Sequence, residues 1–189
     1  MEECPNPGTA KRRHPVLAVL SAAGLLLFLG LQAWNAYAPI AVSDWNRTQA
    51  AKIKISDPDD FTFAVFADHK IQYHFLDEIM KDVSRRSEIS FAVDIGDLVT
   101  EGARGHFRRF LNEVQDDLSI PLLTAVGNHD KNNDEASNYR AIFGPTHYGF
   151  SVAGRRFIVL DATKEAGFDQ AERAWRVKEL EQAKTAKAR

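Results

Sequence analysis

The sequence predicts an α/β domain with a parallel sheet, preceded by one transmembrane helix. Short apolar runs recur along the second part of the chain, and helical patterns of apolar residues separate them. Strands that alternate with helices in this way form a parallel sheet covered on both faces. The membrane helix is predicted from an apolar run of sixteen residues near the N-terminus, in which Ser21 is the single polar residue.

The apolar run predicts a signal anchor over residues 16–38, about the ~20 residues that a helix needs to cross a bilayer. Three basic residues at positions 11–13 precede it, which predicts a cytoplasmic segment at residues 1–15 and an extracytoplasmic domain. The alternative is secretion after signal cleavage near Ala38, where a small-x-small pattern ends. Pro39 would then follow the cut, which opposes cleavage.

Composition excludes several classes of partner and site. With 44% hydrophobic and 26% charged residues the chain falls in the ordinary globular range. A formal net charge of −2 offers no basic surplus, so nucleic acid is not predicted as a partner. The single cysteine, Cys4, has no partner for an internal disulfide and no spacing typical of structural zinc. Nothing in the composition indicates an oligomeric state.

The elements of the domain follow in order. Residues 39–60 are mixed and polar, end in a turn-forming cluster, and predict a stalk or linker. Four short apolar runs predict strands, at residues 61–66, 89–95, 121–126 and 156–160. Two stripes of apolar residues at helical spacing lie between the first three strands: Ile71, Phe75, Ile79 and Val83, then Phe107, Phe110, Leu111 and Val114. A last helix is predicted over residues 169–187.

Polar residues follow each of the first three predicted strands. Asp68 follows the first strand, Gly96-Asp97 the second, and Gly127-Asn128-His129-Asp130 the third. The carboxyl ends of parallel strands face one crevice, where open sheets bind ligands. Carboxylates, an amide oxygen and an imidazole there suit Mn, Fe or Zn better than a metal that prefers thiolates.

These motifs, in this order behind apolar strands, resemble the calcineurin-like metallophosphoesterases. The resemblance implies an α/β/β/α sandwich and hydrolysis of phosphate mono- or diesters by a hydroxide that two divalent metal ions activate. It implies that Asp68 binds the first metal, Asp97 bridges both metals and Asn128 binds the second. It also implies that His129 contacts the phosphate and protonates the leaving group, with Asp130 holding its ring.

The first motif departs from the family pattern. Many members have Asp-x-His, with the histidine as a metal ligand, whereas Lys70 stands at that position and His69 one place earlier. Neighbouring residues of an extended chain point to opposite sides, so His69 is predicted to be a loop or surface histidine, and a ligand only if the loop bends. Lys70 is interpreted either as a point charge near the phosphate or as a solvated lysine.

The later histidine motifs of the family are absent. After His129 the only histidine is His147, which matches no ligand motif. The sequence therefore predicts that residues 61–189 are a truncated domain, about the first half of the sandwich, with weak metal affinity. The alternatives to an active enzyme are a catalytically inactive, membrane-anchored binding module and a gene fragment. Asp94, inside the second strand, is predicted to be a paired buried carboxylate or an extra polar group at the site.

Overall fold

The computed structural model of this protein describes residues 15–70, 72–133, 135–164 and 167–186. The chain divides between Ala38 and Pro39 into two compact units, which are described separately. In the first unit, helix α1 (Pro15–Tyr37) begins at a proline. Proline suits the first helical position because the N–H that it lacks has no helical partner there. Cys4 and the basic residues 11–13 lie outside the described residues.

The predicted membrane anchor over residues 16–38 is not supported. Within the part of the chain that the structure describes, no helix combines the length and the apolarity needed to cross a membrane. The predicted topology and extracytoplasmic location of the domain stay predictions.

The second unit begins before the predicted start of the domain. Residues 39–60, predicted as a stalk, contain helix α2 (Trp45–Ala50), whose side chains enter the core. The Trp45 indole donates a hydrogen bond of 2.8 Å to the Leu122 carbonyl. The Asn46 amide accepts from the Thr124 N–H at 2.8 Å and donates to the Thr124 carbonyl at 3.2 Å. This segment therefore supports the last strand of the parallel sheet, and the stalk prediction is corrected.

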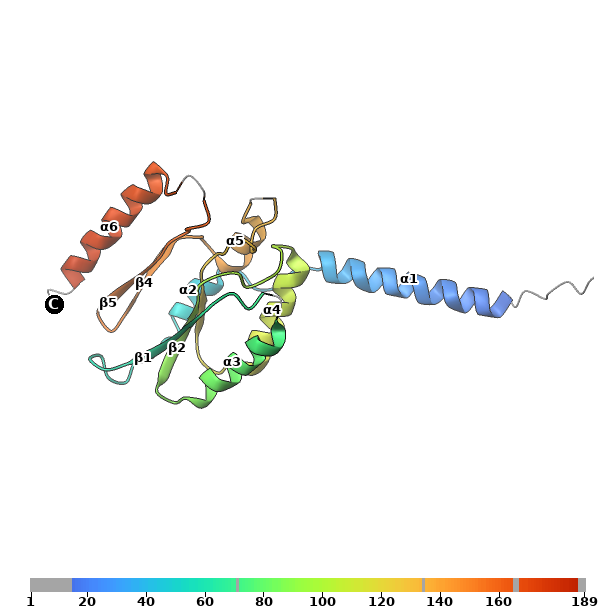
Figure 1. The fold of residues 1–189 in the computed structure, drawn as a ribbon, viewed down its shortest axis with the longest axis horizontal. Coiled ribbons are helices and arrows are strands. Elements are labelled where there is room, and N and C mark those ends of the chain that lie inside the picture. The colour runs from blue at the N-terminus through green and yellow to red at the C-terminus, as the bar shows by residue number, and fades with distance from the viewer. Residues whose placement is uncertain (1–14, 71, 134, 165–166, 187–189) are drawn as a thin grey trace, which may run out of the picture. The chain divides into compact units, whose positions relative to one another are not determined.

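Three parallel strands form the central sheet, as predicted. They are β1 (Thr62–Phe66), β2 (Ile89–Asp94) and β3 (Leu122–Thr124), in the order β1-β2-β3. Helices α3 (Tyr73–Arg85) and α4 (Arg104–Asp117) connect them, and Figure 1 shows both on the same side of the sheet. In register, Phe66 pairs with Asp94 and Asp94 with Thr124. The three strands therefore end at one level.

The fourth predicted strand belongs to a different sheet. Strand β5 (Arg155–Val159) pairs antiparallel with β4 (Tyr148–Val152). The turn between them consists of Ala153 and Gly154, whose φ angles are 47° and 74°. Two left-handed residues make the tight turn whose twist matches a hairpin, so the chain reverses at once and does not cross over to the parallel sheet.

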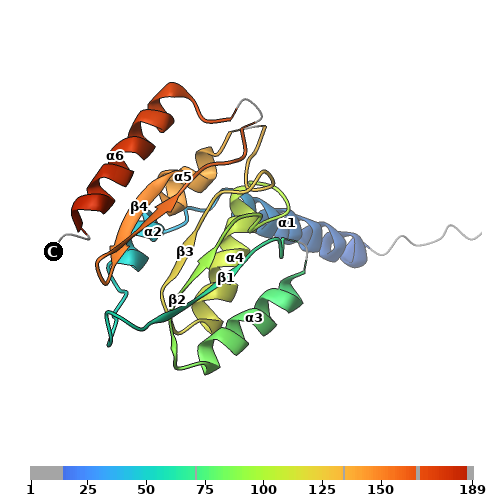
Figure 2. The same cartoon turned by 60° about the vertical axis from the view of Figure 1, so that its left-hand side comes forward.

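The second unit has four layers in its described part. Helices α3 and α4 cover one face of the parallel sheet, and the β4–β5 hairpin covers the other (Figure 2). Helix α6 (Gln170–Ala186) lies on the outer side of the hairpin, where Glu179 accepts a hydrogen bond of 2.7 Å from Nε of Arg156. This arrangement is consistent with part of the α/β/β/α sandwich that the resemblance implied.

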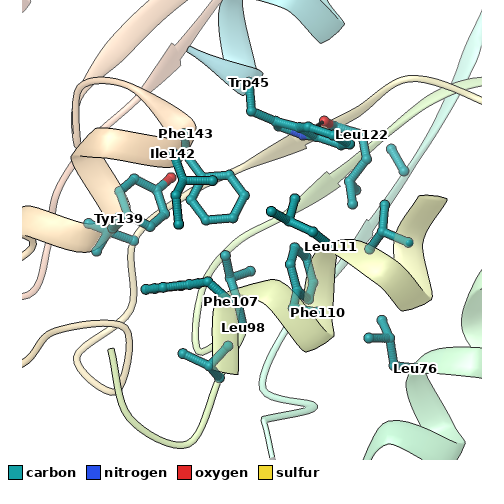
Figure 3. Close-up of a cluster of buried hydrophobic side chains, with 14 of the residues drawn as sticks. Trp45, Leu76, Leu98, Phe107, Phe110, Leu111, Leu122, Tyr139, Ile142 and Phe143 are labelled. Atoms are coloured by element: carbon teal, nitrogen blue, oxygen red, sulfur yellow. Dashed lines mark hydrogen bonds between the residues drawn. The ribbon is translucent and has the colours of Figure 1, made fainter. Parts of the chain in front are cut away.

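Each face of the parallel sheet has its own hydrophobic cluster. Against the helices, rings of α4 pack on helix α5 (Ser137–Phe143), and the ring centroids of Phe107 and Phe143 are 5.5 Å apart (Figure 3). Toward the hairpin, the fully buried Phe91 contacts Phe150 and Phe157 edge to face at 6.1 and 5.6 Å. Burying one such side chain contributes about 1.5–3 kcal/mol, so both layers are firmly attached to the sheet.

The buried face of α3 agrees with the predicted stripe in part. Val83 is buried and Ile79 packs against the same cluster, as predicted. Leu76 and Met80 are also fully buried, whereas Phe75 is 51% exposed. Ile71 lies outside the described residues. The predicted stripe began at Ile71, whereas the helix begins only at Tyr73.

Candidate functional site

The loops that follow β1, β2 and β3 meet at one end of the parallel sheet. Asp68, Asp97 and Asn128 all line one cavity of about 520 Å³ at that end. Backbone and side-chain hydrogen bonds join the loops, because Asp68 N–H donates to the Gly96 carbonyl at 3.1 Å and His129 N–H donates to Asp97 Oδ1 at 3.0 Å. The crevice that the strand-end rule predicted is therefore present.

The two aspartates adopt an uncommon backbone conformation. Asp68 and Asp97 have φ angles of 66° and 57°, in the left-handed region that non-glycine residues rarely enter. Aspartate tolerates this region better than most residues, and such strain concentrates at functional sites. Gly127 allows the loops to approach, since a Cβ there would stand 2.2 Å from both N and Oδ1 of Asp97.

Lys70 joins the two aspartates. Its Nζ donates hydrogen bonds of 2.6 Å to Asp68 Oδ1 and to Asp97 Oδ2. These hydrogen bonds raise the pKa of Lys70 above its usual value, the bond to Asp68 contributing most. Partial burial acts to raise the pKa of Asp97, but hydrogen bonds from Lys70 and from the His129 N–H outweigh it, and the pKa is lowered. The Lys70 ammonium and the Asp97 carboxylate are therefore both charged at neutral pH.

The His129 ring is held by a backbone carbonyl. Its Nδ1 lies 3.0 Å from the Thr100 oxygen. A carbonyl only accepts, so Nδ1 carries the proton in this bond and Nε2 of the neutral ring keeps its lone pair. Protonated, the ring would donate through Nε2. The Thr100 carbonyl therefore engages Nδ1, and Nε2 is the ring nitrogen left for proton transfer.

Asp130 does not hold that ring, contrary to the expectation from the resemblance. It is fully buried, and its two oxygens accept backbone N–H groups from Val99 at 3.0 Å and Gly127 at 2.8 Å. Burial raises the pKa of Asp130 to about 7, against the lowering effect of these two bonds. Asp130 therefore ties the loop after β2 to the loop after β3.

His69 is neither a surface histidine nor a ligand in this arrangement, so its prediction is corrected. It is 5% exposed, its Nε2 lies 2.6 Å from Asp94 Oδ2, and its ring stacks on Phe110 at 5.8 Å. The loop turns the side chain into the core because Asp68 takes the left-handed conformation just before it. Asp94 is thus the paired buried carboxylate of the two alternatives, and burial raises its pKa against the hydrogen bond from His69.

The residues brought together do not fit two metal ions. Across the residues that the structure describes, no group of three or more His, Cys, Asp or Glu side chains is placed to hold a metal. Asp68 and Asp97 converge on one point, and the Lys70 ammonium is already there. Asn128 adds one neutral oxygen. His147 lies elsewhere, with its ring 4.7 Å from that of Trp175.

One segment that lines the crevice was not predicted from the sequence. Ala162, Thr163 and Lys164 line the cavity from the segment after β5. The strand-end rule could not have identified them, because β5 belongs to the antiparallel hairpin and not to the parallel sheet. Lys164 is paired with Glu172 at 2.9 Å and Asp169 at 3.3 Å.

Comparison with protein-family models gives a match that covers most of the second unit. The family model described as calcineurin-like phosphoesterase matches residues 61–174, a span that contains β1 through β5 and every predicted site residue. No curated protein matches the chain.

Proposed function

Since the chain belongs to the calcineurin-like phosphoesterase family, we propose that its strand-end crevice binds phosphate esters and hydrolyses phosphate mono- or diesters. The observation that carries the proposal is the convergence of Asp68, Asp97 and Asn128 on one cavity, with His129 hydrogen-bonded to Asp97 through its backbone. Family membership supports a phosphoesterase-type function, and the convergence supports this crevice as its place.

The crevice offers a phosphate group complementary charge at two points. Lys70 and Lys164 bring ammonium groups to the region, and each is partly neutralised by carboxylates. An ammonium acts on a phosphate as a point charge, so Lys70 is proposed to bind a phosphoryl oxygen. His129 is proposed to donate a proton from Nε2 to the leaving oxygen, because Nδ1 is occupied by the Thr100 carbonyl.

Hydrolysis by a metal-activated hydroxide would need a centre that the described side chains do not form. The donors present are two carboxylates and one amide, and the position between the carboxylates is filled by Lys70. Three oxygen donors bind Mn²⁺, Fe or Zn²⁺ loosely. The described side chains alone therefore do not form a centre that would activate a hydroxide.

A second candidate is a binding module that holds a phosphate ester without cleaving it. The position of Lys70 favours this candidate, because an ammonium supplies charge for binding but does not activate a water molecule as a divalent ion does. Turnover separates the two candidates.

Replacing His129 by Ala is expected to lower turnover of p-nitrophenyl phosphate or bis-p-nitrophenyl phosphate by about 10²–10⁴-fold, the usual contribution of a general acid. Released p-nitrophenolate is followed by absorbance with the full chain, with and without Mn²⁺. His74→Ala, on the exposed surface of α3, is the matched control and is expected to retain wild-type turnover.

Turnover that is lost in His129→Ala and kept in His74→Ala supports the enzyme. Binding of either ester without turnover supports the module. Equal turnover of the wild type and His129→Ala contradicts the assigned role of His129, and a chain that neither binds nor cleaves an ester contradicts both candidates.

A further inference from the structure

We propose that the Lys70 ammonium is a built-in cation that takes the place of a divalent metal ion between Asp68 and Asp97. In the wild-type chain it partly neutralises the two carboxylates without metal, and the crevice binds divalent ions weakly. The inference concerns the crevice of the proposed function but rests on its geometry and not on ester hydrolysis.

The distances make ammonium and metal mutually exclusive. Nζ of Lys70 lies 2.6 Å from Asp68 Oδ1 and 2.6 Å from Asp97 Oδ2. A small divalent ion bound to the same two oxygens would stand about 2.1 Å from each, inside the volume of the ammonium group. Metal binding at this point therefore requires the Lys70 side chain to leave.

Neighbouring contacts hold Lys70 in place. Its side chain is 19% exposed, and its backbone carbonyl accepts a hydrogen bond of 3.0 Å from the Thr100 hydroxyl. The Thr100 carbonyl also accepts a hydrogen bond of 3.0 Å from Nδ1 of His129. Lys70 is thus part of the network that organises the crevice, and it is not a lysine with a freely solvated chain.

Charge explains why a cation is needed there. Two carboxylates that share one site repel each other unless a cation lies between them. With Lys70, the side chains of Asp68, Asp97 and Lys70 carry a formal charge of −1 together. Without it, the two carboxylates carry −2. The neighbouring His69 cannot supply this positive charge. Its ring lies in the core, where Nε2 is 2.6 Å from Asp94 Oδ2.

The test is calorimetric titration of the full-length wild type, Lys70→Met and Lys52→Met with Mn²⁺. Lys52→Met is the matched control, because Lys52 is exposed and lines a different cavity, beside Trp45 and Leu118. Lys70→Met is expected to bind Mn²⁺ at least about tenfold more tightly than the wild type, which corresponds to about 1.4 kcal/mol. Lys52→Met is expected to bind as the wild type does.

Melting temperatures give a second readout. Lys70→Met is expected to melt below the wild type without metal and to be restored by Mn²⁺, since the metal relieves the repulsion between Asp68 and Asp97. Micromolar binding of Mn²⁺ by the wild type overturns the proposal. A folded Lys70→Met that binds no more tightly than the wild type overturns it as well.

A double variant covers the case in which Lys70→Met does not fold. Lys70→Met with Asp68→Asn removes the repulsion together with the cation, and it is expected to fold and to bind Mn²⁺ no more tightly than the wild type. Tighter binding by the double variant contradicts a site built on both carboxylates. Because no ester is present, these results are independent of the turnover that tests the proposed function.

Discussion

Replacing Asp94 by Ala is expected to lower the free energy of unfolding by about 3–5 kcal/mol, the cost of removing one partner of a buried ionisable pair. Asp94 is fully buried, lies 2.6 Å from His69 Nε2 and accepts the Gly96 N–H at 3.3 Å. The substitution leaves an imidazole in the core without its partner, next to the loop that carries Asp68. Urea denaturation followed by circular dichroism measures the loss.

Asp82→Ala is the matched control for that loss. Asp82 also pairs with a basic side chain, Arg86, at 2.9 Å, but both of these side chains are exposed. Its removal is expected to cost less than about 1 kcal/mol. The double variant His69→Leu with Asp94→Val is expected to recover part of the loss, because both polar groups are gone. A cost for Asp94→Ala as small as that for Asp82→Ala would contradict the structural role of the pair.

Replacing Gly127 by Ala is expected to cost about 3 kcal/mol, at the upper end of the usual cost of inserting a methyl group where no space exists. The added Cβ would stand 2.2 Å from the backbone N of Asp97 and 2.9 Å from its Cα. Backbone atoms cannot rotate aside as a side chain does, so the loop after β2 must move. Asp97 then leaves its position beside Lys70, and ester binding is expected to be lost together with stability.

Gly154→Ala separates this crowding from backbone strain. Gly154 has a φ of 74°, and a Cβ there meets no atom within 4 Å. Its substitution is expected to cost only about 1 kcal/mol, from the left-handed conformation alone, and to leave ester binding intact. Denaturation curves measure the stability of Gly127→Ala and Gly154→Ala, and ester titrations measure their binding. A Gly127→Ala variant that matches Gly154→Ala in stability and binding shows that the loops do not need this close approach.

The strands and the crevice could be predicted because they depend on local patterns. Short apolar runs bounded by turn residues identified all three parallel strands, and the strand-end rule brought Asp68, Asp97 and Asn128 together. These signals survive in a single sequence because burial fixes the apolar pattern of a central strand on both faces.

The orientation of His69 could not be predicted, because it depends on one backbone angle. An extended loop would have pointed His69 away from Asp68 into solvent, whereas the left-handed Asp68 turns it onto Asp94 and Phe110. The buried partner lies 25 positions away in the chain, and no periodicity links the two. Asp94 inside an apolar strand was the only hint of a buried polar partner.

The contribution of residues 39–60 was hidden for a related reason. Their composition is polar, which is typical of a linker, yet Asn46 and Gln49 are buried and Asn46 bonds both to the backbone and to the hydroxyl of Thr124. A polar side chain can be a core residue when its hydrogen bonds are satisfied. Composition records polarity but not the partner, so this packing was visible only in the structure.

The most direct test of the central claim is the site at which a phosphate ester binds. Phenyl phosphate is titrated into the ¹⁵N-labelled full chain, and backbone amide shifts are recorded by NMR. We expect shifts at Asp68, Gly96, Asn128 and His129, with none on the exposed face of α3. Shifts confined to other regions, or an unchanged spectrum at millimolar phenyl phosphate, would contradict the claim that the ends of β1, β2 and β3 form a phosphate-ester site.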